Sequence, residues 1–268
     1  MPALQIVSDL HLENLSRYGQ IKIAPKAPYL ALLGDIGCIQ QDAKKGIFRA
    51  MIFRLLKQNN AIFYVPGNHE PYNTTWTAVE EWLKKTEEVA RSKSANGEMI
   101  GDFIPMSKNR FDFDDNFTIL GCTLFSEVPE ERQKTVEKEV NDFHKIKTWS
   151  VKDHVMCHRR HVHWLNSEVQ KAEEEGRKVM TLTHHSPTLD DRAVEEMHRN
   201  DVLLSAFSTD LSAELCWTST AVKLWAFGHT HYNCDFLDEF GERVVTNQKG
   251  YVMVGNSNGW DPDKVIEV

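Results

Sequence analysis

Cysteine is scarce in this chain, and the few cysteines lie far apart. There are five among 268 residues, no two of them form a CxxC pair, and they stand at Cys38, Cys122, Cys157, Cys216 and Cys234. An odd number of scattered thiols is typical of free cysteines in a reducing compartment. The sequence therefore disfavours a disulfide framework as the basis of the fold.

Long apolar runs are also missing. No window reaches the roughly 18 uninterrupted apolar residues that a membrane helix needs. The first residues, Met1–Asp9, lack the basic region and apolar stretch of a signal peptide and read instead as a β-strand. We therefore expect a cytoplasmic protein without a membrane partner.

Positive charge is in the minority. The chain has 31 Lys and Arg against 39 Asp and Glu, a formal net charge of −8, and no Lys/Arg block stands out. Proteins that bind long nucleic acids usually present a basic face, so no such partner is expected. A small anionic substrate is compatible with this charge, because bound metal ions bring their own positive charge.

No Pro/Gly/Ser-rich linker, repeat or low-complexity tract divides the chain, so we expect a single domain over residues 1–268. Hydrophobic residues make up 41%, which is enough for a substantial core. Short apolar runs, each bounded by Gly, Pro or charged residues, predict strands at Leu4–Ser8, Tyr29–Leu33, Ala61–Val65, Lys178–Thr183 and Lys223–Phe227.

Between these runs the apolar residues recur at helical spacing. They predict helices over Asp42–Asn60, Thr74–Arg91 and Asp153–Glu175. Later segments predict strands in hairpins at Phe117–Phe125, Asp235–Leu237, Arg243–Thr246 and Tyr251–Val254, with a turn at Glu239–Glu242. Ser92–Gly97 is predicted as a surface loop and Glu127–Lys147 as a charged insertion. Early strand–helix alternation predicts parallel pairing and the hairpins antiparallel pairing, which gives a mixed α/β architecture with helices outside packed sheets.

Asp, Asn and His residues gather where the predicted strands end. The segments are Ser8-Asp9-Leu10-His11, Gly34-Asp35, Gly67-Asn68-His69-Glu70, Thr183-His184-His185 and Gly228-His229-Thr230-His231. In open α/β sheets ligands bind beyond the carboxyl ends of strands, so these residues are expected to meet in one place. Residues two apart face the same way in extended backbone, which pairs Asp9 with His11 and His229 with His231.

Imidazole and carboxylate together form the ligand set of Mn, Fe or Zn, with Mg and Ni as alternatives. Two Asp, one Asn and four His exceed the needs of one ion, which predicts two ions that share a carboxylate. The site then keeps a surplus of about two positive charges, suited to an anionic phosphoryl group and its transition state. Two such ions about 3.5–4 Å apart can lower the pKa of a bridging water and clamp an in-line displacement. Of the adjacent pair, His184 is nearer the strand end and is expected to point inward. His185 is then expected either at the substrate or behind the ligands, where it would support them.

These motifs, in this order over residues 9–231, resemble the calcineurin-like metallophosphoesterases. The resemblance implies an α/β fold in the form of a four-layer αββα sandwich of two mixed β-sheets flanked by helices. It implies that one ion is held by Asp9, His11, Asp35 and His231. It implies that the other is held by Asp35, Asn68, His184 and His229. Asp35 would then bridge the ions, and His69 would be the catalytic histidine that protonates the leaving oxygen or binds the phosphoryl group.

Two details narrow the resemblance. Trp149, Trp164-Leu165 and Asn247–Tyr251 look like a subgroup of small members with an Asn-Pro-x-Gly-Tyr-like segment, in which Gln248 here takes the Pro place. The phosphate-binding arginines of the protein Ser/Thr phosphatases are missing, because Ile36-Gly37-Cys38 follows Gly34-Asp35 and Pro66 precedes Gly67. A phosphoprotein phosphatase is therefore disfavoured.

The sequence thus predicts a metal-dependent hydrolase of phosphoesters. A small-molecule phosphodiesterase that uses a metal-bridging hydroxide is favoured; the alternatives are a small-molecule phosphomonoesterase, a nuclease on the same site, or a scaffold subunit without catalysis. His185 and Tyr72 are expected to contact the substrate. A run of four histidines between residues 154 and 163 is interpreted as part of an amphipathic helix, because Arg159-Arg160 would repel a metal ion.

Overall fold

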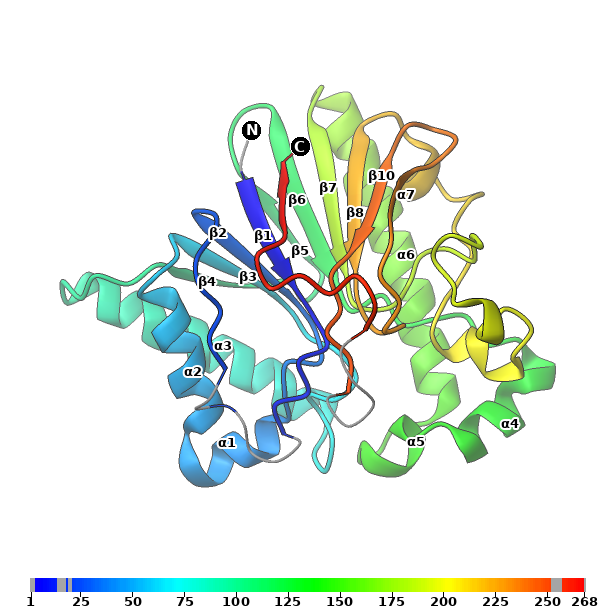
Figure 1. Cartoon of the computed structure of the whole chain (residues 1–268), viewed down its shortest axis with the longest axis horizontal. Coiled ribbons are helices and arrows are strands. Elements are labelled where there is room, and N and C mark those ends of the chain that lie inside the picture. The colour runs from blue at the N-terminus through cyan, green and yellow to red at the C-terminus, as the bar shows by residue number, and fades with distance from the viewer. Residues whose placement is uncertain (1–2, 14–17, 19–20, 252–256, 268) are drawn as a thin grey trace.

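The computed structural model describes residues 3–13, 18, 21–251 and 257–267. Two mixed β-sheets pack face to face, and helices cover the outer face of each sheet (Figure 1). The expected αββα sandwich is confirmed. Within the described residues, no helix is both long enough and apolar enough to cross a bilayer.

The first sheet has the strand order β11-β1-β2-β3-β4, in which β11 runs antiparallel to β1 and the other pairs are parallel. Its strands are β1 (Ala3–Val7), β2 (Tyr29–Leu33), β3 (Ala61–Val65), β4 (Asp102–Pro105) and β11 (Val265–Glu267). Its outer face is covered by α1 (Ile39–Lys45), α2 (Ile47–Leu56) and α3 (Trp76–Ala95) (Figure 1). These helices belong to the crossovers that parallel strands require.

The second sheet has the order β5-β6-β7-β8-β10-β9, with parallel pairs inside and an antiparallel pair at each edge. Its strands are β5 (Asn109–Asp112), β6 (Phe117–Cys122), β7 (Lys178–Thr183), β8 (Val222–Phe227), β9 (Asp235–Leu237) and β10 (Arg243–Thr246). On its outer side lie α6 (Val151–Glu174) and α7 (Leu215–Thr218) (Figure 1). Four short helices complete this half: α4 (Glu130–Glu139), α5 (Asp142–Lys145), η2 (Glu196–His198) and η3 (Val202–Ala206).

Side chains of the parallel strands alternate between two cores, because successive residues of a strand point to opposite faces. In β2, Ala31 and Leu33 lie in the core between the sheets, whereas Leu30 and Leu32 lie against the helices. Both faces are therefore buried. This explains why these strands are continuous apolar runs in the sequence.

Two helix predictions need correction. The helix expected over Asp42–Asn60 is wrong as a single element, because Gly46 adopts a left-handed φ of +61° and separates α1 from α2. The Gly46 amide donates to the Asp42 carbonyl at 2.7 Å and so caps α1. The loop expected at Ser92–Gly97 is wrong in part, because α3 continues to Ala95.

The strand expected over Phe117–Phe125 ends at Cys122, since Leu124 and Phe125 have left-handed φ values of +69° and +56°. Strands β4, β5 and β11 lie outside the predicted set, and each has only three or four residues. Of the strand expected at Tyr251–Val254, Tyr251 is not in a strand and residues 252–254 lie outside the described residues.

Three buried histidines of α6 hold the sharp bend that follows β6. The Leu124 amide donates to His161 Nδ1 at 3.1 Å, and the Ser126 amide donates to His154 Nε2 at 2.9 Å. In return, His158 Nδ1 donates to the Leu124 carbonyl at 3.1 Å. Their interpretation as packing residues of an amphipathic helix is confirmed, and this bend lies directly beside the site.

The bend makes the stability of the protein depend on pH. Burial lowers the pKa of His161 from 6.5 to about 3, so the unfolded chain takes up this proton first as the pH falls. The contribution of neutral, buried His161 to the free energy of unfolding is therefore complete above pH 6.5. Below that pH it declines by at most about 1.4 kcal/mol per pH unit. We expect His161→Asn, which keeps an acceptor for Leu124, to reduce this slope in urea unfolding between pH 7 and 5. The exposed His163→Asn is the control, and an unchanged slope in His161→Asn would contradict the assignment.

Candidate metal centre and active site

Five of the predicted site residues stand on strained backbone. Left-handed φ values of 54°, 46°, 53°, 73° and 53° occur at Asp9, His11, Asp35, His229 and His231. Non-glycine residues adopt this region at a cost of about 1–3 kcal/mol each, and such strain is concentrated at functional sites. The sharp turns redirect these side chains into a common space where the parallel strands end.

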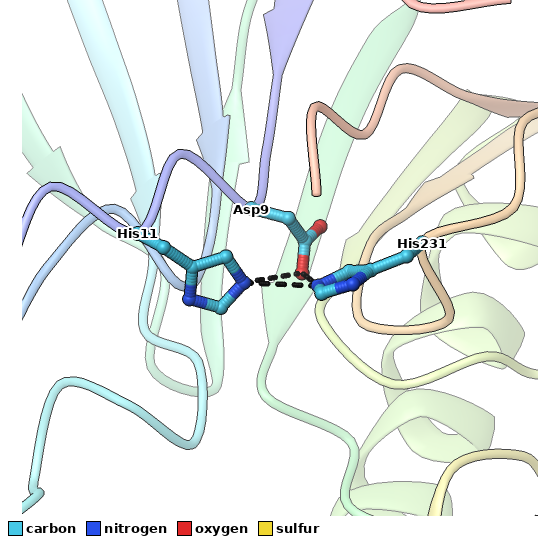
Figure 2. A group of neighbouring side chains, drawn as sticks. All are labelled: Asp9, His11 and His231. Atoms are coloured by element: carbon cyan, nitrogen blue, oxygen red, sulfur yellow. Dashed lines mark hydrogen bonds and ion pairs between the residues drawn. The ribbon is translucent and has the colours of Figure 1, made fainter. Parts of the chain in front are cut away.

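Asp9, His11 and His231 form a first cluster, shown in Figure 2. One potential ligand atom of each lies within 4.8 Å of the others. His231 Nε2 lies 2.9 Å from His11 Nε2 and 3.4 Å from Asp9 Oδ1. Residues that follow β1 and β8 are thus brought together, although His11 and His231 are 220 positions apart in the sequence.

Asp35, His184 and His229 form a second cluster, in which one potential ligand atom of each again lies within 4.8 Å of the others. His184 Nε2 lies 3.4 Å from Asp35 Oδ1 and 2.9 Å from Asn68 Oδ1. His184 Nδ1 donates to the Leu33 carbonyl at 2.8 Å. Since Nδ1 carries the proton, Nε2 is the nitrogen left to face an ion.

Asp35 lies between the two clusters. Its Oδ1 is the oxygen near His184, and its Oδ2 lies 3.9 Å from His11 Nε2. The His69 amide donates to Oδ1 at 2.8 Å and holds the carboxylate in this orientation. Each oxygen of the Asp35 carboxylate therefore lies within 3.9 Å of a histidine of a different cluster.

The charges of the site fit metal ions. Asp9 and Asp35 are 0% and 1% exposed, and among the described residues their ion-pair partners are histidines. Burial raises the pKa of Asp35 well above its usual range, and the charges of Glu70 and Asp9 add to the effect. Burial acts in the same direction on Asp9, but hydrogen bonding and the charge of His231 outweigh it and lower the pKa. Cations would relieve this buried negative charge, and the imidazole, carboxylate and amide donors suit transition metals.

Glu70, the last residue of the Gly-Asn-His-Glu motif, lies behind the ligands. Its carboxylate accepts hydrogen bonds from the Tyr64 hydroxyl and from the amides of Asp35, Ile36 and Gly67, at 2.7–3.1 Å. Burial raises its pKa to about 7. This single side chain ties the end of β2 to the end of β3, and so sets the spacing of the ligands that follow the two strands.

His69 lies beside the clusters. Its Nδ1 is 2.8 Å from Glu13 Oε1, and its ring stacks on Tyr72 with the centroids 4.2 Å apart. Its Nε2 lies 3.3 Å from the Tyr251 hydroxyl and 3.7 Å from Asp35 Oδ2. This places a ring nitrogen of His69 at the cleft, with the ring held from two sides.

Glu13 was not predicted. Together with His11 and His69 it forms a third group whose ligand atoms lie within 4.8 Å of one another. Its Oε1 approaches the Nδ1 atoms of both rings, at 3.4 Å from His11 and 2.8 Å from His69. A carboxylate on Nδ1 orients a histidine so that Nε2 faces the site. The spacing Asp9-x-His11-x-Glu13 was the available signal, but its premise of extended backbone is wrong here, because Asp9 and His11 are left-handed and β1 ends at Val7.

Gln248 supports the site from the place of the expected proline. Its Oε1 accepts from the His231 amide at 2.5 Å, and its Nε2 donates to Thr230 Oγ1 and the Tyr232 carbonyl, both at 2.9 Å. The side chain thus holds the Gly-His-Thr-His turn. Nothing in the local sequence pattern indicates these contacts, because they join segments up to 18 residues apart.

The two residues expected to contact substrate lie in different surroundings. Tyr72 lines the cleft described below, beside His69. His185 is 0% exposed, its Nδ1 lies 3.2 Å from the Thr123 carbonyl, and its ring is packed against that of His229 at 4.2 Å. The structure therefore brings Tyr72 to the cleft and places His185 behind a candidate ligand.

A cleft of about 480 Å³ opens over the clusters, within the usual range for small-molecule sites. Its floor includes Asp35, Asn68, His69, His229 and His231. Its apolar wall is built from the segments around α4, α5, η2 and η3, with Val140, Val194, Leu203, Leu204 and Phe207. The charged insertion predicted at Glu127–Lys147 is thus one side of this cleft.

A family model for calcineurin-like phosphoesterases matches residues 5–233. The chain belongs to this family. The resemblance inferred from the motifs is confirmed, and with it the assignment of the chain as a phosphoester hydrolase.

Three relatives illustrate the similarity. Protein L509 of Acanthamoeba polyphaga mimivirus is 27% identical over 293 residues, which cover 100% of this chain and 97% of that protein. The structure of a phosphopantetheinyl hydrolase from Mycobacterium tuberculosis has a TM-score of 0.64 at 16% identity, covering 93% of this chain and 90% of that one. A dimetal phosphatase from Danio rerio has a TM-score of 0.55 at 13% identity, with coverages of 92% and 88%. The two structures share the fold.

Glu70 provides a test of how the site is held. In Glu70→Gln an amide NH₂ replaces one acceptor oxygen and faces backbone N–H groups, which leaves at least one buried donor unpaired. We expect a loss of about 1–3 kcal/mol in the free energy of unfolding, measured with urea. The exposed Glu81→Gln is the control. A Glu70→Gln variant as stable as the control would show that the carboxylate does not hold the two strand ends.

Proposed function

We propose that this chain is a small-molecule phosphodiesterase whose whole length, residues 1–268, forms one catalytic domain around a dinuclear metal centre. The observation that carries the proposal is the pair of His/Asp clusters that meet at Asp35. The first ion would be held by Asp9, His11, Asp35 and His231. The second would be held by Asp35, Asn68, His184 and His229. Mn, Fe and Zn suit these donors best, with Mg and Ni as alternatives.

When bound, two divalent ions supply an activated water and stabilise the charge of the phosphoryl group in the transition state. The chain orients the remaining partners. Glu13 holds His69 at Nδ1, so that its Nε2, near the Tyr251 hydroxyl, can donate a proton to the leaving oxygen. Tyr72 is proposed as a substrate contact on the same side of the cleft. We do not extend that role to the fully buried His185.

Charge at the cleft favours a diester. Beyond the floor, the cleft is lined by the exposed acids Glu139, Glu195 and Asp201, and its lining within the described residues contains no Lys or Arg. A diester carries one negative charge at neutral pH and a monoester nearly two. These three acids, the acidic rim of the cleft, therefore repel a diester less than a monoester. They also repel a small substrate less than a long nucleic acid.

The metal centre can be tested by replacing one proposed metal ligand and, separately, the proposed proton donor. Asp35→Asn should lose metal and activity together, because both clusters depend on this carboxylate. His69→Ala should keep about two metals per chain while turnover falls by about 10²- to 10⁴-fold. Elemental analysis and hydrolysis of bis-p-nitrophenyl phosphate provide the two measurements. Turnover by fully metal-free protein would refute the proposal. Two bound metals without turnover on cyclic nucleotides, glycerophosphodiesters or aryl phosphates would favour the scaffold alternative.

The preference for diesters can be tested at the rim. A unit charge about 10 Å away interacts with the extra charge of a monoester by ~0.4 kcal/mol in water, or roughly twofold in rate. We expect Glu195→Gln with Asp201→Asn to raise kcat/KM for p-nitrophenyl phosphate about fourfold relative to bis-p-nitrophenyl phosphate. Glu196→Gln, whose side chain is exposed outside the cleft lining, is the matched control. Faster hydrolysis of the monoester by the unaltered enzyme would establish the phosphomonoesterase alternative.

A further inference from the structure

The charged insertion brings one buried carboxylate to the edge of the metal centre. Asp142, the first residue of α5, is 4% exposed. Its Oδ1 accepts hydrogen bonds from Asn68 Nδ2 at 2.8 Å and from the Tyr72 hydroxyl at 2.7 Å. Asp142 lies between the Gly-Asn-His-Glu and Thr-His-His segments and belongs to none of the motifs on which the resemblance was based. The insertion therefore contributes to the site itself as well as to the wall of the cleft.

The bond to Asn68 determines which end of its amide faces the site. A carboxylate accepts hydrogen bonds and cannot donate them, so Asp142 must receive the NH₂ end of the amide. The opposite end, Oδ1, then lies 2.9 Å from His184 Nε2. Metal ions bind an amide through its oxygen. Asp142 thus selects the one orientation in which Asn68 can serve as a ligand.

The bond to Tyr72 acts on the other side of the site. The Tyr72 ring stacks on His69 with an interplanar angle of 29°, and its hydroxyl is anchored on the same Asp142 oxygen. A ring tethered at its far end is restricted to one position against its neighbour. The carboxylate that orients Asn68 therefore also supports the histidine that faces the cleft.

A purely structural role in α5 does not account for these bonds. Asp142 follows the N-cap position of α5, which Asn141 occupies, so its carboxylate is not the capping side chain of this helix. Both hydrogen bonds that the Asp142 carboxylate accepts in the described structure come from residues 70 or more positions earlier in the chain.

We propose that Asp142 is a positioning residue that orients Asn68 toward the second metal ion and, through Tyr72, holds His69 at the substrate. This inference rests on the proposed function for the identity of the ion site and the acid. It makes α5 a part of the catalytic apparatus of this chain.

The test compares side chains of similar size at position 142 that differ in how many hydrogen-bond acceptor oxygens they carry. Asp142→Leu removes both acceptor oxygens, whereas Asp142→Asn keeps one and can act as the conservative rescue. Replacement of groups that orient metal ligands typically costs about 10- to 100-fold in metal affinity. We expect this loss for the second Mn²⁺ in Asp142→Leu, measured by calorimetric titration, with the first Mn²⁺ retained and a smaller loss in Asp142→Asn. In Tyr72→Phe both ions should bind as before, while kcat falls severalfold.

Asp42→Leu is the matched control, because Asp42 is also a buried carboxylate on a short helix but accepts from the Trp82 indole and the Arg49 amide. Thermal melting checks that each variant is folded; if Asp142→Leu is not, the decision rests on Asp142→Asn and Tyr72→Phe. Unchanged Mn²⁺ affinity in the Asp142 variants, or an equal loss in Asp42→Leu, would overturn the proposal. The Mn²⁺ titration does not depend on turnover, so a failure of the phosphodiesterase assay leaves this result readable.

Discussion

Buried negative charge is the constraint on which this site depends. Asp9 and Asp35 are removed from water, and in the described structure they face imidazole rings and the backbone amides of His229 and His69. A charge in a medium of low dielectric is costly unless a cation or a set of hydrogen bonds accompanies it. The left-handed backbone at the candidate ligands adds strain to this cost. The sandwich supplies the rigidity that holds these unfavourable arrangements in place, and metal ions would supply the compensating charge.

Carboxylates outside the ligand set then give the site its geometry. Glu13 orients two histidine rings, Glu70 joins the ends of β2 and β3, and Asp142 orients the amide of Asn68. Each accepts several hydrogen bonds from groups that belong to different segments of the chain. Because a carboxylate only accepts, each one also determines which end of its partner points inward. The positions of the candidate ligands are therefore set by acidic side chains that surround them.

Much of the fold was predictable because apolar runs indicate strands and apolar residues at helical spacing indicate helices. Both patterns can be seen within short segments of the sequence. The bounds of β2 and β3 agree with the apolar runs, since a strand buried on both faces needs apolar residues at every position. The bounds of β7, β9 and β10 also agree with the prediction. The breaks were harder to predict. Gly46 divides a continuous helical pattern, and the left-handed turn at Leu124 ends a strand pattern that continues in the sequence. The turn at Leu124 depends on contacts with distant residues, namely the α6 histidines that hold it. The bond that ends α1 at Gly46 is local, but a glycine inside a helical pattern does not by itself mark a helix end.

The sequence by itself determined the order of the ligand motifs and a mixed α/β architecture, because strand-end residues and apolar runs are properties of short segments. The motifs identified the family, and the resemblance to that family implied the sandwich. The tertiary structure decided the rest. That His185 lies behind His229 depends on how its buried ring packs there. That Gln248 and Asp142 support the site depends on hydrogen bonds across 17 and 74 positions. Such contacts form only once the chain has packed, and no local pattern encodes them.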